Sequence, residues 1–360
     1  MGFIGKIFKK KSLDDAYPKG FSVLKVKALS RLTKDSVQLS FDVPEGDKQK
    51  FFFIPGQYVN LAIVIDGEEY RRSYSICSGP NQDLAVAIKK VENGKVSTWA
   101  NDSLSVGDDV LVSFPQGSFN WKKEKGFVVA FVAGSGITPV LSIAKALEDE
   151  IGEMRLFYGN KSIENTMFYD QINDLKNTKT HYSFSQEKQD WALSGRLTKE
   201  AISNQLKQNL MLLKADVFYL CGPEQLIKDA KEVLTLFGVS KDKIQFELFT
   251  TPILLIDDVV SNTPAFTGES EVTVHLDNEE ISLKLNATSL SVLDALNKQG
   301  YDPPYSCRGG VCCTCKAKVT EGSAMMKMNF SLTDQEVSEG YVLTCQCYPT
   351  SEKLVLTYDF

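Results

Sequence analysis

The chain has 360 residues, of which 43% are hydrophobic and 24% are charged, and its formal net charge is -6. This length exceeds one average domain and suits two or three domains, each able to bury its own core. The composition is that of an ordinary globular protein and excludes a disordered chain, and no apolar run approaches the roughly 20 residues of a membrane span.

The N-terminal stretch, residues 1–17, is predicted to be a basic tail. It mixes apolar side chains with lysines but has neither a full apolar signal segment nor a small-residue cleavage site. No export signal is therefore expected, and a cytoplasmic location is predicted. Weak contact with a membrane surface is the alternative to a frayed tail, but stable membrane insertion is not expected.

Residues 18–121 have the pattern of a β-barrel. Apolar and polar side chains alternate in 37–43 and in 59–65, which is typical of half-buried antiparallel strands. Turn signals recur at short spacing, at Pro44-Glu45-Gly46, Pro55-Gly56, Gly79-Pro80 and Gly107-Asp108. Short strands with close turns and no long helix indicate a compact antiparallel barrel.

The pattern changes in residues 122–252, where an apolar run at 127–133 is typical of a parallel strand covered on both faces. After this run, helical and strand patterns alternate. Helices are predicted at 139–150, 164–175 and 224–237, and strands at 154–158, 180–184, 217–221 and 244–249. The alternation predicts an α/β nucleotide-binding domain.

A third domain, 269–360, is predicted after a linker at 253–268 that is rich in Asp, Ser, Thr and Pro. It opens with a hairpin, in which strands at 272–276 and 281–285 flank a polar turn. Ser289 is then predicted to cap a helix. A hairpin followed by a helix and a cysteine-rich loop is the beginning of a β-grasp fold.

The chain contains eight cysteines, which favour a metal or redox site over a disulfide framework because no export signal is visible. Cys307, Cys312 and Cys315 have the C-x4-C-x2-C spacing of plant-type ferredoxins, and Cys345 supplies a fourth thiolate. These four cysteines are the predicted ligands of a [2Fe-2S] cluster.

Two alternatives to the cluster remain open. Four cysteines can also bind zinc, and Cys312 with Cys315 could act as a dithiol redox pair. Zinc sites usually combine two short C-x-x-C knuckles, which this spacing lacks. The two neighbouring cysteines, Cys313 and Cys347, are predicted to be non-ligands.

The segment Arg72-Ser73-Tyr74-Ser75 resembles the Arg-x-Tyr-Ser signature of the ferredoxin-NADP reductase family. The resemblance implies that Arg72 contacts a flavin phosphate, that Tyr74 packs on the isoalloxazine and that Ser75 lies near the reactive N5. Two later segments resemble those that hold the flavin ring and the pyrophosphate of FAD in that family. Their predicted cofactor-binding residues are Ala87, Ile88, Lys89, Gly94, Val96, Ser97 and Thr98. Small residues with free N–H groups suit a phosphate dianion.

A glycine turn at 134–139 ends the first strand of the α/β domain and opens a helix. Such a helix N-terminus stabilises a pyrophosphate. The turn resembles the nicotinamide-nucleotide loop of the same family. Its predicted binding residues are Gly134, Gly136, Thr138 and Pro139.

The end of the α/β domain carries further residues for which the resemblance implies a role. Cys221, with Gly222 and Pro223, is placed beside the nicotinamide, and Glu247 and Phe249 match the segment that lies near the flavin. The implied catalytic residues are Ser75, Cys221 and Glu247. A buried strand cysteine without a catalytic role is the alternative for Cys221.

The choice of nucleotide is predicted from the end of the second strand of this domain. Lys161 and Ser162 lie there, with no carboxylate immediately after the strand to accept a ribose 2′-OH. Together with Arg196, they could meet a 2′-phosphate. The sequence therefore favours NADPH over NADH.

The order of flavin, nucleotide and ferredoxin domains resembles reductase components of multicomponent oxygenases, in particular the phenylacetyl-CoA epoxidase type. The resemblance implies an oxidoreductase that passes electrons from NADPH through FAD and [2Fe-2S] to an oxygenase or another one-electron acceptor, with an aromatic CoA thioester as the downstream substrate. A phthalate-dioxygenase-reductase type, with FMN and NADH, has the same order. A non-enzymatic redox sensor is the remaining alternative, and no nucleic-acid partner is expected.

Overall fold

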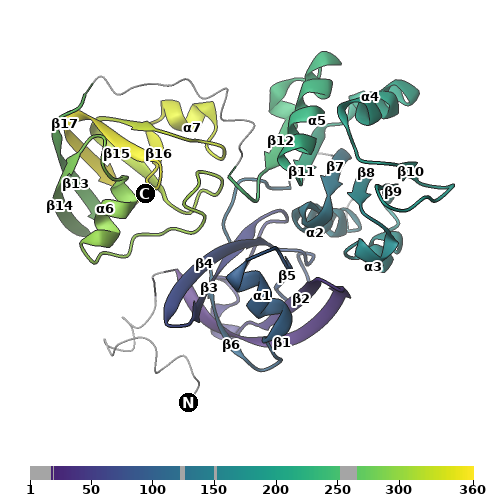
Figure 1. Cartoon of the computed structure of the whole chain (residues 1–360), viewed down its shortest axis with the longest axis horizontal. Coiled ribbons are helices and arrows are strands. Elements are labelled where there is room, and N and C mark those ends of the chain that lie inside the picture. The colour runs from purple at the N-terminus through teal and green to yellow at the C-terminus, as the bar shows by residue number, and fades with distance from the viewer. Residues whose placement is uncertain (1–17, 19, 122–125, 150–151, 252–265) are drawn as a thin grey trace. The chain divides into compact units, whose positions relative to one another are not determined.

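The computed structural model describes residues 18, 20–121, 126–149, 152–251 and 266–360. The tail predicted at 1–17 lies outside these residues, as do 253–265 of the predicted linker. The chain forms two compact units, one ending at Phe249 and the other beginning at Thr250 (Figure 1). Within the described ranges, no helix is long and apolar enough to cross a membrane.

The first unit opens with an antiparallel six-stranded sheet in the order β4-β3-β6-β1-β2-β5. The elements are β1 (Phe21–Thr33), β2 (Ser36–Asp42), η3 (Glu45–Asp47), β3 (Tyr58–Ile65), β4 (Glu68–Ser75), β5 (Ala85–Lys89), α1 (Lys95–Asp102) and β6 (Asp109–Ser113). An isolated bridge between Ile76 and Val86 joins the two edges, so the sheet curls into the predicted barrel. The alternation predicted for β2 is confirmed, because Val37, Leu39 and Phe41 are buried in the barrel core.

The same unit contains a parallel six-stranded sheet in the order β10-β9-β8-β7-β11-β12, which confirms the predicted α/β domain. Its strands are β7 (Phe127–Ala133), β8 (Glu153–Asn160), β9 (Thr178–Phe184), β10 (Leu193–Ser194), β11 (Val217–Cys221) and β12 (Ile244–Glu247). Its helices are η4 (Gly134–Gly136), α2 (Ile137–Leu147), η5 (Ile163–Asn165), α3 (Tyr169–Asn173), α4 (Lys199–Gln208), η6 (Leu210–Lys214), α5 (Glu224–Leu236) and η7 (Lys241–Lys243). The chain runs from β7 outward to β10 and returns on the other side of β7 with β11. The topological switch point, where ligands bind in such sheets, therefore lies between the carboxyl ends of β7 and β11.

Three details of this domain differ from the prediction. The helix predicted at 164–175 is replaced by η5 and the short α3, because Phe168 takes a left-handed backbone conformation, φ 61°, just before α3. Helix α2 begins before Pro139, since proline is tolerated in the first turn of a helix. The last strand ends at Glu247, so Phe249 lies beyond it and is 41% exposed.

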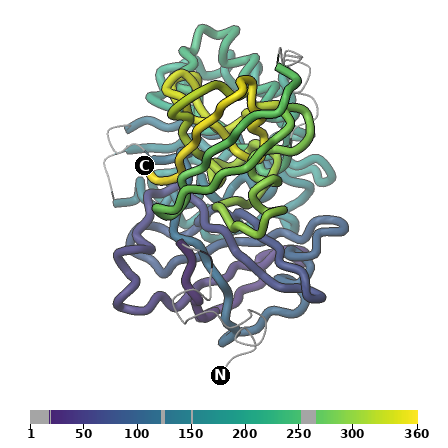
Figure 2. The backbone as a smooth tube through the Cα atoms, turned by 90° about the vertical axis from the view of Figure 1, so that its left-hand side faces the viewer, coloured from purple at the N-terminus to yellow at the C-terminus, as the bar shows by residue number. Residues whose placement is uncertain are grey.

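The second unit is a five-stranded sheet in the order β14-β13-β17-β15-β16, with α6 packed on its core. Its elements are β13 (Glu269–Leu276), β14 (Glu279–Asn286), α6 (Val292–Lys298), β15 (Lys316–Met326), α7 (Asp334–Ser338), β16 (Tyr341–Leu343) and β17 (Cys347–Thr357). The predicted hairpin is formed by β13 and β14, and β13 also pairs in parallel with β17. Figure 2 shows the yellow C-terminal strands beside this green hairpin, which is the arrangement of a β-grasp fold.

The helix cap predicted at Ser289 is wrong. The side chain of Ser291 accepts the N–H of Asp294, so α6 begins at Val292. The Ser289 hydroxyl instead donates to the carbonyl of Asn286 in the preceding turn. Both serines precede apolar residues, and only the register of those residues against the sheet decides which serine caps the helix.

Candidate functional site

Strand β4 presents the Arg-x-Tyr-Ser segment along one edge of the barrel. The Arg72 side chain is exposed, and one of its nitrogens donates to the carbonyl of Arg71 at 2.7 Å. Tyr74 packs against the barrel core, and burial raises the pKa of its phenol. Ser75 is only 5% exposed. The strand therefore offers three groups in order. The Arg72 cation suits a phosphate, the Tyr74 ring suits a flat ring system, and the buried Ser75 hydroxyl suits the reactive edge of that ring system.

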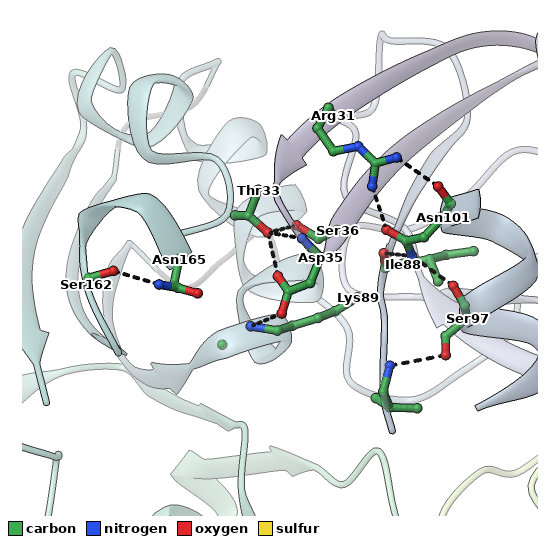
Figure 3. A network of polar contacts seen from close by, with 12 residues as sticks. Arg31, Thr33, Asp35, Ser36, Ile88, Lys89, Ser97, Asn101, Ser162 and Asn165 are labelled. Atoms are coloured by element: carbon green, nitrogen blue, oxygen red, sulfur yellow. Dashed lines mark hydrogen bonds and ion pairs between the residues drawn. The ribbon is translucent and has the colours of Figure 1, made fainter. Parts of the chain in front are cut away.

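The segment predicted to lie along the flavin ring runs through β5. The Ile88 side chain is buried in the barrel core, and that of Ala87 is buried in the cluster shared with the α/β domain, so both offer a ligand mainly their backbone. Lys89 lies 3.8 Å from the carboxylate of Asp35 (Figure 3). Asn101 of α1 donates to the carbonyl of Ile88 at 3.2 Å, which fixes this helix to the strand.

The segment predicted to bind pyrophosphate begins at Gly94, the N-cap of α1. A Cβ at Gly94 would lie 2.4 Å from both Ser97 Oγ and Val91 Cγ2, so a side chain at this position would displace one of them. The Ser97 hydroxyl accepts the N–H of Val91 and donates to the carbonyl of Gly94. It is therefore engaged locally, and the site offers backbone N–H groups: those of Lys95, Val96 and Ser97 have no acceptor within the helix.

The nucleotide loops after β7 and β11 touch at the switch point. A Cβ added to Gly136 would lie 2.3 Å from the carbonyl oxygen of Cys221, and Gly222 has φ +148° beside Ala133. Tyr158, two residues before the end of β8, donates its hydroxyl to the carbonyl of Gly134 at 3.1 Å. Because Gly136 and Gly222 have no side chains, the backbones of the two loops contact each other directly. The result is a narrow turn at the N-terminal end of α2, where a phosphate group can bind.

The three predicted catalytic residues are brought together from two domains. Cys221 and Glu247 are direct neighbours in the parallel pairing of β11 with β12. Ser75 of the barrel donates to Glu247 Oε2 at 3.1 Å. Burial raises the pKa of Glu247 to about 7, and the hydrogen bond from Ser75 partly offsets that rise. Burial, together with the Glu247 carboxylate, raises the pKa of the Cys221 thiol, so Cys221 stays neutral.

The residues predicted to select the nucleotide lie at one edge of the sheet. Lys161 and Ser162 follow β8 and Arg196 follows β10, with the end of β9 between them. Sequence reasoning missed Glu187, whose Oε2 accepts the N–H of Ile163 at 2.8 Å. Its position just after a strand of the same sheet was the available signal, because the carboxyl ends of parallel strands share one edge.

The cysteine loop brings sulfur atoms together in two pairs. Cys312 Sγ donates to Cys307 Sγ at 3.1 Å, and this bond, with the N–H of Gly309, lowers the pKa of Cys307 to about 6. In the second pair, a hydrogen bond from Cys315 lowers the pKa of Cys345. The same bonds raise the pKa of their donors, Cys312 and Cys315, and all four cysteines must lose their protons to bind a cluster.

The arrangement of these pairs favours a two-iron centre. The pairs are Cys307 with Cys312 and Cys315 with Cys345, so each iron of a [2Fe-2S] cluster could take one pair. Gln346 donates to the carbonyl of Arg308 at 2.9 Å and steadies the loop. The cysteine loop therefore fits the cluster that its spacing predicts.

The two remaining cysteines of this unit face elsewhere. Cys313 Sγ lies 3.5 Å from the carbonyl oxygen of Ser331, to which it donates. Cys347 is fully buried in the sheet core, and burial raises the pKa of its thiol to about 12. Neither environment stabilises a thiolate.

Three family models match the chain in succession. They are an oxidoreductase FAD-binding domain at residues 23–121, an oxidoreductase NAD-binding domain at 131–232, and a 2Fe-2S iron-sulfur cluster binding domain at 274–350. Each model covers one of the three sites described above.

One component of 1,2-phenylacetyl-CoA epoxidase from Escherichia coli is 36% identical over 351 residues, which cover 94% of this chain and 98% of that protein. The chain belongs to the ferredoxin-NADP reductase family. It is a flavoreductase with a C-terminal [2Fe-2S] domain, and it is an NAD(P)H-dependent oxidoreductase.

The reductase has further relatives with the same organisation. It is 29% identical over 346 residues to the ferredoxin reductase component of 3-ketosteroid-9-alpha-monooxygenase from Mycobacterium tuberculosis, which covers 91% of this chain and 93% of that protein. The solved structure of phthalate dioxygenase reductase matches 94% of this chain and 98% of its own, with 25% identity and a TM-score of 0.58. The reductase is thus of the kind that serves oxygenase systems.

Proposed function

We propose that this reductase oxidises NADPH and delivers single electrons to an oxygenase that acts on an aromatic CoA thioester. The observation that carries the proposal is the contact of Ser75 with Glu247 beside Cys221. This contact joins β4, the proposed flavin strand, to the switch point between β7 and β11, where the nucleotide is proposed to bind. When bound, FAD would accept a hydride and release its two electrons one at a time, as a [2Fe-2S] cluster requires, with one proton left to be removed. The 36% identity to the phenylacetyl-CoA epoxidase component supports the thioester substrate.

The chain's own residues have the following proposed roles. Arg72 and the N-terminus of α1 hold the flavin phosphates, Tyr74 covers the ring, and Gly134 to Pro139 hold the nucleotide pyrophosphate. The nicotinamide lies against the turn that follows β11. The remaining proposed contacts are Ala87, Ile88, Lys89, Lys161, Ser162, Arg196, Gly222, Pro223 and Phe249, and the proposed iron ligands are Cys307, Cys312, Cys315 and Cys345.

We further propose that Ser75 and Glu247 carry the proton away from the flavin edge. With a pKa of about 7, Glu247 is protonated and unable to accept a proton below that pH, and ionised above it. Turnover with cytochrome c should therefore rise with pH across about 7. We expect Glu247→Gln to be at least about tenfold slower and to lose this rise.

The control for this pH profile is Glu232→Gln, which removes an exposed carboxylate paired with Lys199. It should keep the wild-type pH profile. A Glu247→Gln variant with the wild-type pH dependence would show that the proton leaves by another route.

An anaerobic absorption titration tests nucleotide and cofactors together. We expect the flavin and iron-sulfur bands to bleach on addition of NADPH, and at least about tenfold more slowly with NADH if a 2′-phosphate contact of about 1.4 kcal/mol is made. A protein that stays colourless after reconstitution, or that holds zinc, would contradict the oxidoreductase mechanism. Bleaching with a turnover too slow to reduce cytochrome c would favour the redox sensor.

A second candidate, the FMN and NADH type, is favoured by one observation. The Glu187 carboxylate accepts the N–H of Ile163, the residue after Ser162. In a nucleotide complex, a ribose 2′-OH could donate to this carboxylate in place of the Ile163 N–H. Faster bleaching with NADH, and FMN in the extracted flavin, would establish this alternative. Faster bleaching with NADPH would leave Glu187 as a support for the loop.

We also propose a cytoplasmic location and functional boundaries at 18–121, 122–252 and 269–360, joined by the linker at 253–268. All eight cysteines are free, which suits a reducing compartment. Coupled NADPH consumption with the purified catalytic components of phenylacetyl-CoA epoxidase is the test of the partner. Uncoupled consumption alone would point to a different oxygenase.

A further inference from the structure

Helix α2 links the nucleotide loop to the flavin strand. It begins at Ile137, directly after the glycine turn. At a rise of 1.5 Å per residue, Lys145 lies about 12 Å further along the helix. There Lys145 Nζ donates to the carbonyl of Cys77 at 3.1 Å, and Ser142 Oγ donates to the carbonyl of Ser78 at 2.6 Å. Cys77 and Ser78 are the second and third residues after the end of β4.

Lys145 is an unusual choice for this position. Burial lowers the pKa of its ammonium group, and the neighbouring Cys77 thiol partly offsets that fall. Lys145 is half-buried, and moving a cation partly out of water costs free energy, so a neutral residue would be the less costly filler. Its stem is also closely packed, because a Cβ on Gly79 would lie 3.2 Å from Lys145 Cβ.

The surrounding contact is apolar and continuous. A single hydrophobic cluster combines side chains of the barrel domain with side chains of α2. Its members include Cys77, Phe119, Trp121, Val140, Ile143 and Ala144. Such a surface resists separation but carries no directional bond. The two hydrogen bonds from α2 supply direction, because each is made to one backbone carbonyl of the flavin-strand extension.

We propose that Lys145 and Ser142 are positioning residues that set the flavin strand against the nucleotide loop. Helix α2 then fixes the distance between the glycine turn at its N-terminus and the backbone of Cys77 and Ser78 that follows β4. This distance determines how closely the nicotinamide approaches the flavin. This inference rests on the proposed function, since it requires hydride transfer at the switch point. A misplacement of about 1 Å lowers such rates by about 100-fold.

The test is stopped-flow reduction of the FAD-loaded holoenzyme of Lys145→Met, which keeps the apolar stem and removes the donor. With saturating NADPH, we expect the hydride-transfer rate to fall at least about tenfold and the isotope effect with 4-deuterated NADPH to increase. We expect the nucleotide Kd to stay within about twofold and the flavin content to match the wild type. The visible circular dichroism of the bound flavin should also shift, because it depends on the position of the flavin relative to the surrounding protein and does not depend on turnover.

A second variant and a control separate positioning from stability. Ser142→Ala should change the rate and the flavin spectrum in the same direction, and Lys199→Met, at an exposed salt bridge, should change neither. Wild-type rates in both Lys145→Met and Ser142→Ala would overturn the inference. Loss of flavin with an unchanged rate per bound flavin would assign them a merely structural role and would also overturn it. If the wild type is reduced by neither nucleotide, the proposed function itself fails.

Discussion

Cys345→Ser is expected to lose the [2Fe-2S] cluster, whereas Cys347→Ser is expected to keep it. Cys345 forms a sulfur pair with Cys315 that lowers its pKa, so it is available as a thiolate ligand. Cys347 lies only two residues further but is fully buried in the sheet core. Iron and acid-labile sulfide per chain, together with the electron paramagnetic resonance signal of the reduced protein, measure the outcome.

The effect on electron flow should be equally separated. Without the cluster, Cys345→Ser should still reduce ferricyanide from the flavin but should lose at least about 90% of electron transfer to a protein acceptor, because the flavin no longer has its one-electron outlet. Cys347→Ser is the matched control, and burial of its hydroxyl should lower the free energy of unfolding by about 1–3 kcal/mol. A cluster retained in Cys345→Ser and lost in Cys347→Ser would reverse the ligand assignment.

Gly136→Ala is expected to lower nucleotide-driven flavin reduction by about 100-fold. The new Cβ would lie 2.3 Å from the carbonyl oxygen of Cys221 and 2.7 Å from the amide nitrogen of Gly222. These contacts are with backbone, so no side-chain rotation relieves them and the two loops must separate. The separation should also cost about 1–3 kcal/mol of folding stability.

Rapid-mixing kinetics with NADPH and a thermal melt measure the effects of Gly136→Ala. Gly46→Ala is the control, since the added methyl group at Gly46 meets nothing within 4 Å. The flavin and cluster absorption of Gly136→Ala should be unchanged, because neither of those sites lies in this turn. An unaltered rate and nucleotide affinity in Gly136→Ala would show that the β7 and β11 loops do not form the nucleotide site.

Local patterns predicted the architecture because the order of apolar and polar side chains along the strands differs between the domains. Alternating side chains in β2 identified the barrel, and the apolar run of β7 identified the parallel sheet. Short-range errors arose where local patterns were ambiguous. Ser289 and Ser291 are equally good caps by composition, and the conformation of Phe168 depends on its burial in the α/β core.

The candidate sites divide in the same way. Cys307, Cys312 and Cys315 could be assigned from the sequence, because a cluster loop is contiguous and its spacing is the signal. Glu187 could not, because its contact with Ile163 joins segments that follow different strands. Lys145 could not either, since a lysine in an amphipathic helix ordinarily faces solvent and only the packed barrel buries this one.

The sequence by itself determined the three domains, their order, the cofactor class and the cysteine loop, because these depend on contiguous residues and on period. Tertiary structure alone decided that Ser75 meets Glu247 beside Cys221, since a strand of one domain must dock on the sheet of another. It also decided the pKa of Glu247, because desolvation is a property of the surroundings and not of the residue. The proposed proton route and the placement by α2 both depend on that docking.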